Sequence, residues 1–402
     1  MKEFIKKHRF LIILFLTSFI LRLIYILIVK TPIISDFRTM YDASKELLNH
    51  TNKYYNSQYF TMWGYQMGHT YYQYLLLKIV NSVVFLKIVN CLCTSLIVVF
   101  IYLIARKKVS EKSARIASII YMLFPFPLFL NSVLTNQHLP LLLILIGTYL
   151  FLNIDFKNIN NKSIFKMIVI GILFGFSNIM RSELVVILFS ILLFFIILIK
   201  KINFKNSIFC FTLIIISYLL VTTSTSFIFK KTNLSKNGLS NMNTYWKFVC
   251  GLNYKTNGMY SDEDARIYSA DKKLAKEETI NRIKNYKKLP LLFAKKSKIL
   301  LLNSDLSWSI GHINNQRTYN ILNAINKIFI VTLVILSIIS VKYIFKMDYT
   351  YLLCAIILLV YIGVYMLIEV MPRYAYSLQP FMTILSAYGI EQIFSILNHK
   401  KL

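Results

Sequence analysis

The chain has 402 residues, 56% of them hydrophobic, and a formal net charge of +29. In a soluble protein this charge would suggest a nucleic-acid partner, but here the basic residues stand mainly in short loops between apolar runs. Apolar runs of about 18 residues or more recur along the chain and are long enough to cross a hydrocarbon core of about 30 Å. We therefore expect an all-α, multi-pass membrane protein with no nucleic-acid partner.

The apolar runs predict about ten transmembrane helices. A basic N-terminal segment precedes the first of them, at residues 10–29, so this helix starts on the inner side. The later spans are predicted at residues 86–105, 116–134 and 139–154, at two runs on either side of Arg181, and at residues 208–229, 325–341, 350–368 and 375–397. With these spans every short basic loop lies on the inner side, as the positive-inside rule requires.

The same pattern divides the chain into three regions. Residues 1–229 form a transmembrane module with a long first outer loop at residues 30–85, residues 230–322 form a small extracytoplasmic domain, and residues 323–402 form the C-terminal transmembrane helices. Within the first outer loop, residues 71–85 contain Lys78 and Asn81, so we expect an interfacial amphipathic helix there. If this segment were a membrane span, all later helices would be inverted.

Charged residues of both signs gather at the outer ends of the predicted helices. Ionisable groups at membrane depth are costly and usually mark a functional site. Those at or just beyond the outer helix ends are Asp36, Asp42, Arg181, Glu183, Glu369 and Arg373. This distribution favours an active centre at the outer membrane surface over a pore through the bilayer.

Asp36 and Asp42 follow the first span and are the candidate catalytic acids. A carboxylate where water, headgroups and protein meet is well placed to act as a general base on an incoming hydroxyl. Asp36 is the stronger candidate, with the alternative that it caps a short interfacial helix. Asp42 has the alternative of lying on the solvated face of that helix.

Several short motifs, in this order and topology, resemble integral-membrane glycosyltransferases of the GT-C fold. The nearest group is the bacterial protein-mannosyltransferase-like and aminoarabinose-transferase-like enzymes, family 39 and its neighbours. The motifs are an Asp soon after the first span, Arg181 after a span containing Gly171, the outer stretch from Tyr245-Trp246 to Gly258-x-Tyr260, and Glu369-x-x-x-Arg373-Tyr374 before Pro380. The chain departs from the family at Gln66–Thr70, where members are often Pro-rich, and at Thr135–His138, where they often carry an acidic residue.

The resemblance implies a polyprenyl-phosphate-linked sugar as donor. Asp36 would take a proton from an acceptor hydroxyl, the oxygen would attack the anomeric carbon, and the lipid phosphate would leave in a single, inverting displacement. Arginine suits the leaving phosphate because its planar fork is always charged, so Arg181 and Arg373 are the candidate phosphate ligands. The alternatives are ion pairs of Arg181 with Glu183 and of Arg373 with Glu369, one helical turn away.

Other residues are expected to support the site. Glu183, Glu369 and Tyr374 adjoin the two arginines, and Asp305 lies with Trp308 near the point where the chain re-enters the membrane. His138 has the alternative of a neutral, hydrogen-bonded residue at a helix end. The lysines at 295, 296 and 298 are candidates for further phosphate contact, or for a solvated face.

The sequence predicts no cofactor, although a divalent metal at the phosphate stays possible and unassigned because no dense carboxylate group is present. The acceptor is expected to be a glycan, a glycolipid or a protein, and membrane lipids are the surrounding partners. The location is expected to be a bacterial cell membrane, with the active site outside. Two other functions stay open: a lipid-linked polysaccharide polymerase or ligase, which would rely on outer-loop residues such as His312 and Arg317, and a lipid-linked sugar transporter or flippase.

Overall fold

The computed structural model describes residues 2–303, 305–313 and 315–399. Within these ranges every regular element is a helix, and the β-type pairing found there is an isolated bridge between Trp63 and Asn241. The predicted all-α fold is therefore confirmed.

Seven helices of the described chain are long and apolar enough to cross a membrane. They are α1 (Lys2–Ile28), α5 (Val83–Ala105), α9 (Asn161–Met180), α11 (Phe204–Lys231), α17 (Gln316–Ile339), α18 (Tyr349–Leu367) and α19 (Gln379–His399). An eighth candidate consists of α6 (Glu111–Leu123) and α7 (Pro125–Phe129), which are bent by 54° where they meet. Pro125 explains this bend, because the residue before a proline is driven out of the helical region and Phe124 is extended.

The remaining two of the ten predicted spans are shorter helices. α8 (His138–Phe151) and α10 (Leu184–Ile197) have 14 residues each, which corresponds to about 21 Å of helix, less than a hydrocarbon core. α8 nevertheless runs between the two ends of the bundle, because Asn153, just beyond it, accepts a hydrogen bond from Lys107, which follows α5. The ten predicted spans thus correspond to seven or eight candidate membrane spans among the described residues and to two apolar helices that are shorter than a span.

The first outer loop is helical, as predicted. It contains α2 (Ser35–Leu48), α3 (Gln58–Met62) and α4 (Gln66–Ile79). The amphipathic helix predicted at residues 71–85 begins and ends earlier, and the chain leaves the helix at Val80 before α5 starts. α4 packs against α2 and α9, so the loop is fixed to the transmembrane helices.

The residues predicted to form an outer domain fold into short helices between α11 and α17. They are α12 (Trp246–Gly251), α13 (Asp262–Tyr268), α14 (Lys272–Lys284), α15 (Leu289–Leu302) and α16 (Ser307–Ile310). A largely buried ion pair at 2.8 Å between Asp264 of α13 and Arg282 of α14 joins these two helices, and α15 packs against α17 and α18.

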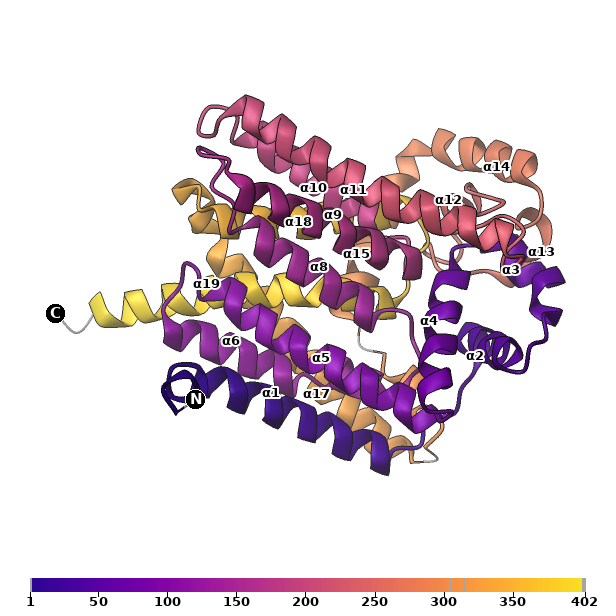
Figure 1. Cartoon of the computed structure of the whole chain (residues 1–402), viewed down its shortest axis with the longest axis horizontal. Coiled ribbons are helices and arrows are strands. Elements are labelled where there is room, and N and C mark those ends of the chain that lie inside the picture. Colours follow the sequence, from indigo (N-terminus) through magenta and orange to yellow (C-terminus); the bar gives the residue numbers. More distant parts are fainter. Residues whose placement is uncertain (1, 304, 314, 400–402) are drawn as a thin grey trace.

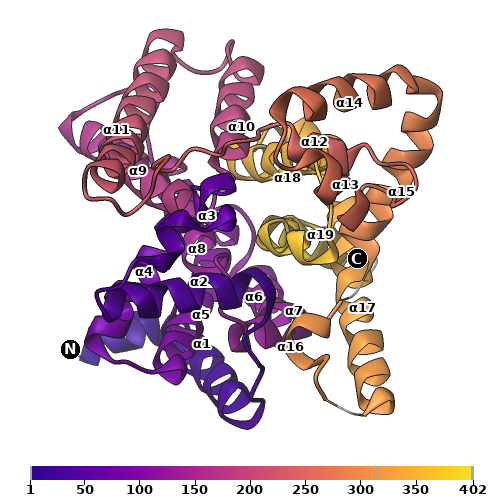
Figure 2. The same ribbon diagram turned by 90° about the vertical axis from the view of Figure 1, so that its right-hand side faces the viewer.

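The long helices lie side by side, and both termini lie at one end of the bundle (Figure 1). The helices of the first outer loop and α12–α14 lie at the opposite end, at the right of Figure 1. Figure 2 looks onto this end, where α2 and α3 lie on one side and α12 and α13 on the other. The loop and the outer domain therefore surround the ends of α8, α9 and α18.

Candidate active site

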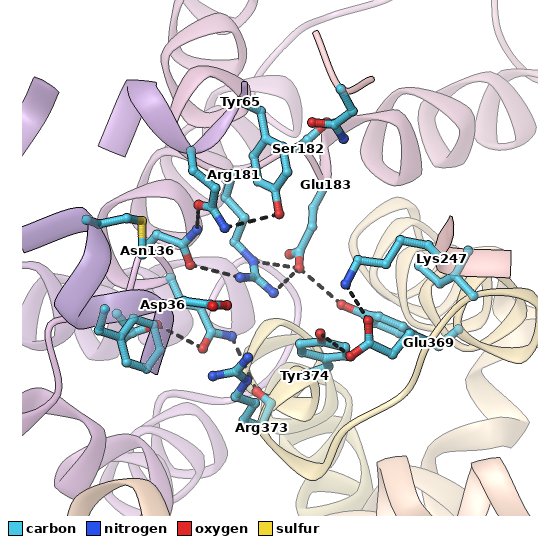
Figure 3. Close-up of a pocket in the computed structure, with 18 residues that line it drawn as sticks. Asp36, Tyr65, Asn136, Arg181, Ser182, Glu183, Lys247, Glu369, Arg373 and Tyr374 are labelled. Atoms are coloured by element: carbon cyan, nitrogen blue, oxygen red, sulfur yellow. Dashed lines mark hydrogen bonds and ion pairs between the residues drawn. The ribbon is translucent and has the colours of Figure 1, made fainter. Parts of the chain in front are cut away.

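A pocket lies at this end of the bundle, where residues from the first outer loop, the outer domain and the ends of several transmembrane helices meet (Figure 3). It contains about 900 Å³ of space, part of it open to solvent. The polar and charged side chains that line it are Asp36, Tyr65, Gln66, Thr135, Asn136, Gln137, Arg181, Ser182, Glu183, Asn241, Lys247, Tyr365, Glu369, Arg373 and Tyr374. Six predicted site residues are therefore brought together: Asp36, Arg181, Glu183, Glu369, Arg373 and Tyr374.

Asp36 lies in the first turn of α2 and faces the pocket. It does not cap this helix: the N-cap residue is Ile34, and no side chain accepts a hydrogen bond there. Ser35 has φ 53°, a left-handed conformation that is uncommon outside glycine and that sets the direction in which α2 begins. Among the described residues, the Asp36 carboxylate accepts no hydrogen bond and forms no ion pair.

Asp42 does not line the pocket. Its carboxylate pairs with Arg38, one turn earlier in α2, at 2.7 Å, and both side chains are about half exposed. The structure therefore gives no support to the predicted catalytic role of Asp42 and agrees with the alternative of a solvated helix face.

Arg181 is held in place by three contacts. It follows the last residue of α9, its Nε and Nη2 lie 2.6 Å and 2.5 Å from Glu183, and its Nη1 donates to the Asn136 side chain at 3.0 Å. Glu183 in turn accepts hydrogen bonds from Tyr365 at 3.1 Å and Ser377 at 2.8 Å. Burial by itself would lower the pKa of Arg181, but Glu183 raises it, so the guanidinium stays charged. The predicted alternative pairing is present, and it orients Arg181 toward the pocket.

Arg373 is not paired with Glu369. It lies in the short helix η5 (Pro372–Ser377), and its guanidinium stacks on Trp308 at 4.3 Å and lies 5.4 Å from the ring of Phe37. In the described part of the chain this guanidinium donates no hydrogen bond to a protein group. Its donors are therefore free to bind an anion in the pocket.

Glu369 is paired with a lysine that sequence reasoning missed. Lys247 of α12 forms an ion pair with it, and Tyr374 donates a hydrogen bond to it at 3.3 Å. Burial would lower the pKa of Lys247, but Glu369 raises it well above its ordinary value. The only sequence signal was a single lysine within the apolar stretch from Trp246 to Cys250.

Two other predicted supporting residues lie outside the pocket. His138 is buried, with Nδ1 2.7 Å from the Tyr376 hydroxyl and Nε2 3.2 Å from the carbonyl of Leu130. A carbonyl only accepts, so Nε2 carries the proton and Nδ1 accepts from Tyr376, which is the neutral arrangement given as the alternative. Asp305 accepts a hydrogen bond from the Ser307 backbone at 2.9 Å. It thereby shapes the turn before Trp308.

The lysines at 295, 296 and 298 do not reach the pocket. Lys295 and Lys298 are exposed on α15, as expected of a solvated face. Lys296 is fully buried, and its ammonium contacts backbone carbonyls. The possible phosphate contact of these lysines is therefore not supported.

The Thr135–Gln137 turn lines the pocket with amides where members of the resembling family often carry an acidic residue. Asn136 bonds both Arg181 and, at 2.9 Å, the side-chain oxygen of Gln66. No group of three or more His, Cys, Asp or Glu that is suited to a metal ion occurs among the described residues. A metal therefore stays unassigned.

Two charged pocket residues, one carboxylate and one guanidinium, have no ion-pair partner among the described residues. Arg181 is neutralised by Glu183 and Lys247 by Glu369, whereas Asp36 and Arg373 have no ion-pair partner in the part of the chain that the structure describes. An unpaired carboxylate can accept a proton, and an unpaired guanidinium can bind a phosphate.

An apolar groove lies beside this pocket, between α4, α9 and α11. Its lining includes Gly68, Tyr71, Leu75, Phe176, Ile179, Met180, Ile228 and Phe229. Met180 lines the groove, and Arg181, the next residue in the sequence, lines the polar pocket. The groove and the pocket therefore adjoin at the end of α9.

The chain is similar to membrane glycosyltransferases in sequence and in structure. Residues 67–228 match the family model described as dolichyl-phosphate-mannose-protein mannosyltransferase. A sequence comparison with curated proteins found no match.

Two of the solved structures with a similar fold are of the oligosaccharyltransferase of Archaeoglobus fulgidus. One is this archaeal enzyme, AglB, in complex with an inhibitory peptide and a dolichol-phosphate, with 13% identity, a TM-score of 0.57, and coverage of 99% of this chain and 52% of that one. The other is its apo form, with 12% identity, a TM-score of 0.54, and coverage of 96% and 51%. The chain thus spans about half the length of these structures. The resemblance seen in the sequence is confirmed: this is a multi-pass membrane protein with the GT-C fold of integral-membrane glycosyltransferases.

Proposed function

We propose that the protein is a glycosyltransferase that moves a sugar from a polyprenyl-phosphate donor to an acceptor hydroxyl. The observation that carries the proposal is the pocket in which Asp36 and Arg373 have no ion-pair partner among the described residues, while Arg181 is held beside them. The family match over residues 67–228 supports the reaction class.

A lipid-linked donor is supported by the apolar groove next to the pocket. A polyprenyl chain lying between α4, α9 and α11 would have its phosphate near Arg181, because Met180 lines the groove and Arg181 lines the pocket. Apolar surface binds a hydrocarbon chain at about 25 cal/mol per Å² buried, and the pocket arginines bind the phosphate. The similar archaeal enzyme was solved with a dolichol-phosphate, which agrees with this class of donor.

The proposed reaction is a single displacement. The Asp36 carboxylate takes the proton of the acceptor hydroxyl, and the acceptor oxygen forms a bond to the anomeric carbon. The bond between that carbon and the phosphate oxygen breaks, and polyprenyl phosphate leaves with the electron pair. Attack from the face opposite the leaving group inverts the anomeric centre.

The two arginines have different parts in this proposal. Arg373 has free donors and binds the phosphate directly, so that it stabilises the charge that develops on the leaving group. Arg181 is neutralised by Glu183, and those of its N–H groups that are not bonded to Glu183 or Asn136 orient the phosphate.

The pocket is placed on the extracytoplasmic side of a bacterial cell membrane in this proposal. The support is that Lys107 and Lys108, which follow α5, lie at the end of the bundle away from the pocket, where basic loops mark the cytoplasmic side. The acceptor is a glycan, a glycolipid or a protein that reaches this surface.

The test is to incubate the purified protein in liposomes with a panel of polyprenyl-phosphate sugars and to measure the released polyprenyl phosphate. We expect release with at least one donor, and release slowed by about 10²- to 10⁴-fold with Asp36→Asn. His312→Ala and Arg317→Ala serve as controls, because both side chains are exposed and outside the pocket. Activity that survives Asp36→Asn but is lost in those two variants would favour the polymerase or ligase. Movement of intact donor across the bilayer without released phosphate would favour a transporter.

A further inference from the structure

The buried ammonium of Lys296 connects three segments of the chain. Lys296 lies on α15, is 0% exposed, and donates to the backbone carbonyls of Gly251 at 2.7 Å and of Met366 and Ile368 at 2.8 Å each. Gly251 ends α12, which carries Lys247, and Ile368 precedes Glu369. One side chain thus joins both backbones that carry the Lys247–Glu369 pair.

The number of donors matches the number of acceptors. A protonated lysine has three N–H donors, and here each has one carbonyl, so every hydrogen of the ammonium is used. A buried cation without such partners would be costly, and the three carbonyls offset part of that cost. Neighbouring Lys295 and Lys298 are exposed, and neither makes a comparable contact with another described residue.

The same junction contains main-chain hydrogen bonds between the outer domain and the end of α18. The Glu369 amide donates to the carbonyl of Lys247 at 2.8 Å, and the Val370 amide donates to that of Gly258 at 2.9 Å. Gly258 has φ 79°, and a Cβ there would lie 2.7 Å from Cδ of Lys296. The Lys296 side chain therefore lies against the loop whose Gly258 carbonyl accepts the hydrogen bond from the Val370 amide.

We propose that Lys296 is a positioning residue that fixes Lys247 and Glu369 in the pocket by holding Gly251, Met366 and Ile368 together. This inference rests on the proposed glycosyltransferase function for its effect on activity. Its structural part concerns only how the outer domain is attached to the end of α18.

The structural part is tested by hydrogen exchange measured by mass spectrometry on the full chain in detergent. Lys296→Met removes the donors and keeps an unbranched apolar side chain, and Lys296→Gln keeps two donor hydrogens if the methionine variant does not fold. We expect faster exchange at the Glu369 and Val370 amides in both, and wild-type exchange in Lys295→Met. Unchanged exchange at these amides would overturn the proposal, whether or not the protein transfers sugar.

The functional part is tested by a double-mutant cycle on sugar transfer. We expect Lys296→Met to lower kcat/KM by about 10- to 100-fold, as small displacements of site groups do. If Lys296 acts through Lys247, Lys296→Met adds little further loss to Lys247→Met. Additive losses in the double variant, or full activity of Lys296→Met with faster exchange, would overturn the positioning role. Absence of transfer by the wild type would reject the proposed function, and the exchange result would still decide whether Lys296 holds the junction.

Discussion

Arg373 places its guanidinium 4.3 Å from the ring centre of Trp308, a residue of the outer domain. A guanidinium that stacks on an indole keeps the N–H donors at its edge available for an anion. The outer domain therefore contributes to both sides of the pocket: Trp308 supports Arg373, and Lys247 neutralises Glu369.

The support by Trp308 gives a prediction about donor affinity. Trp308→Leu is expected to raise the KM for the lipid-linked donor by about tenfold, because a cation stacked on an indole in a partly desolvated site is worth about 1 to 2 kcal/mol. The measurement is the donor dependence of polyprenyl phosphate release. Arg373→Lys should give a loss at least as large, since lysine cannot form the bidentate contact. An unchanged KM in Trp308→Leu would show that the stacking does not position Arg373 for the donor.

The two acids of α2 are predicted to differ sharply. Asp36→Asn is expected to reduce the transfer rate by about 10²- to 10⁴-fold, the usual contribution of a general base, without loss of protein from the membrane. Asp42→Asn is the matched control, since its partner Arg38 is exposed and such surface pairs contribute about 0 to 1 kcal/mol. Rates measured at saturating donor separate catalysis from binding. Equal losses in the two variants would contradict the assignment.

Asn136 is predicted to act through Arg181. Asn136→Ala removes the 3.0 Å hydrogen bond to the guanidinium, which should cost about 1.5 to 3 kcal/mol and lower kcat/KM about tenfold or more. The control is Asn160→Ala, which removes the N-cap of α9 at the far end of the same helix. That variant should lose about 1 kcal/mol of stability with little change in KM. If both variants lowered kcat/KM equally, the effect of Asn136 would be one of general stability.

The stability of the protein is predicted to depend on pH through Lys296. Burial lowers the pKa of this lysine to about 7, while Glu369 and Cys250 oppose the shift. Below this value the folded chain holds the ammonium with all three donors, and above it the amine keeps two, because the cost of burying the charge outweighs the third hydrogen bond. Between this value and the ordinary pKa of about 10.4, the unfolded chain binds a proton that the folded chain does not, so the free energy of unfolding rises with pH in that window. Apparent melting temperatures at pH 7 and pH 9 measure this, with Lys296→Met as the reference. We expect a larger rise in the wild type than in the variant, and equal rises would contradict the shifted pKa.

The sequence was sufficient for the class of fold and for the neighbourhood of the site. Hydropathy and length are local properties, and a helix in lipid satisfies its own backbone groups, so the apolar runs mark the helices almost wherever the structure has them. Charges at the outer ends of these runs are then forced to one end of the bundle. Asp36, Arg181 and Arg373 meet in one pocket for this reason.

Which charges pair with each other was decided only by the tertiary structure. Glu369 and Arg373 are four residues apart and would be neighbours on one helix, but α18 ends at Leu367, and both Ile368 and Met371 are extended. Their side chains therefore find other partners. Glu369 meets Lys247, which is 122 positions away, and Arg373 meets Trp308.

The exposure of Asp42 and the burial of Lys296 were likewise not predictable from the sequence. Both residues stand beside other charged residues in helical segments, yet Asp42 is exposed and Lys296 is fully buried. The sequence determined that these segments form helices, because helix formation depends on nearby residues. The packing of the outer domain against the end of α18 determined which polar groups lost their water, because burial depends on segments far apart in the chain.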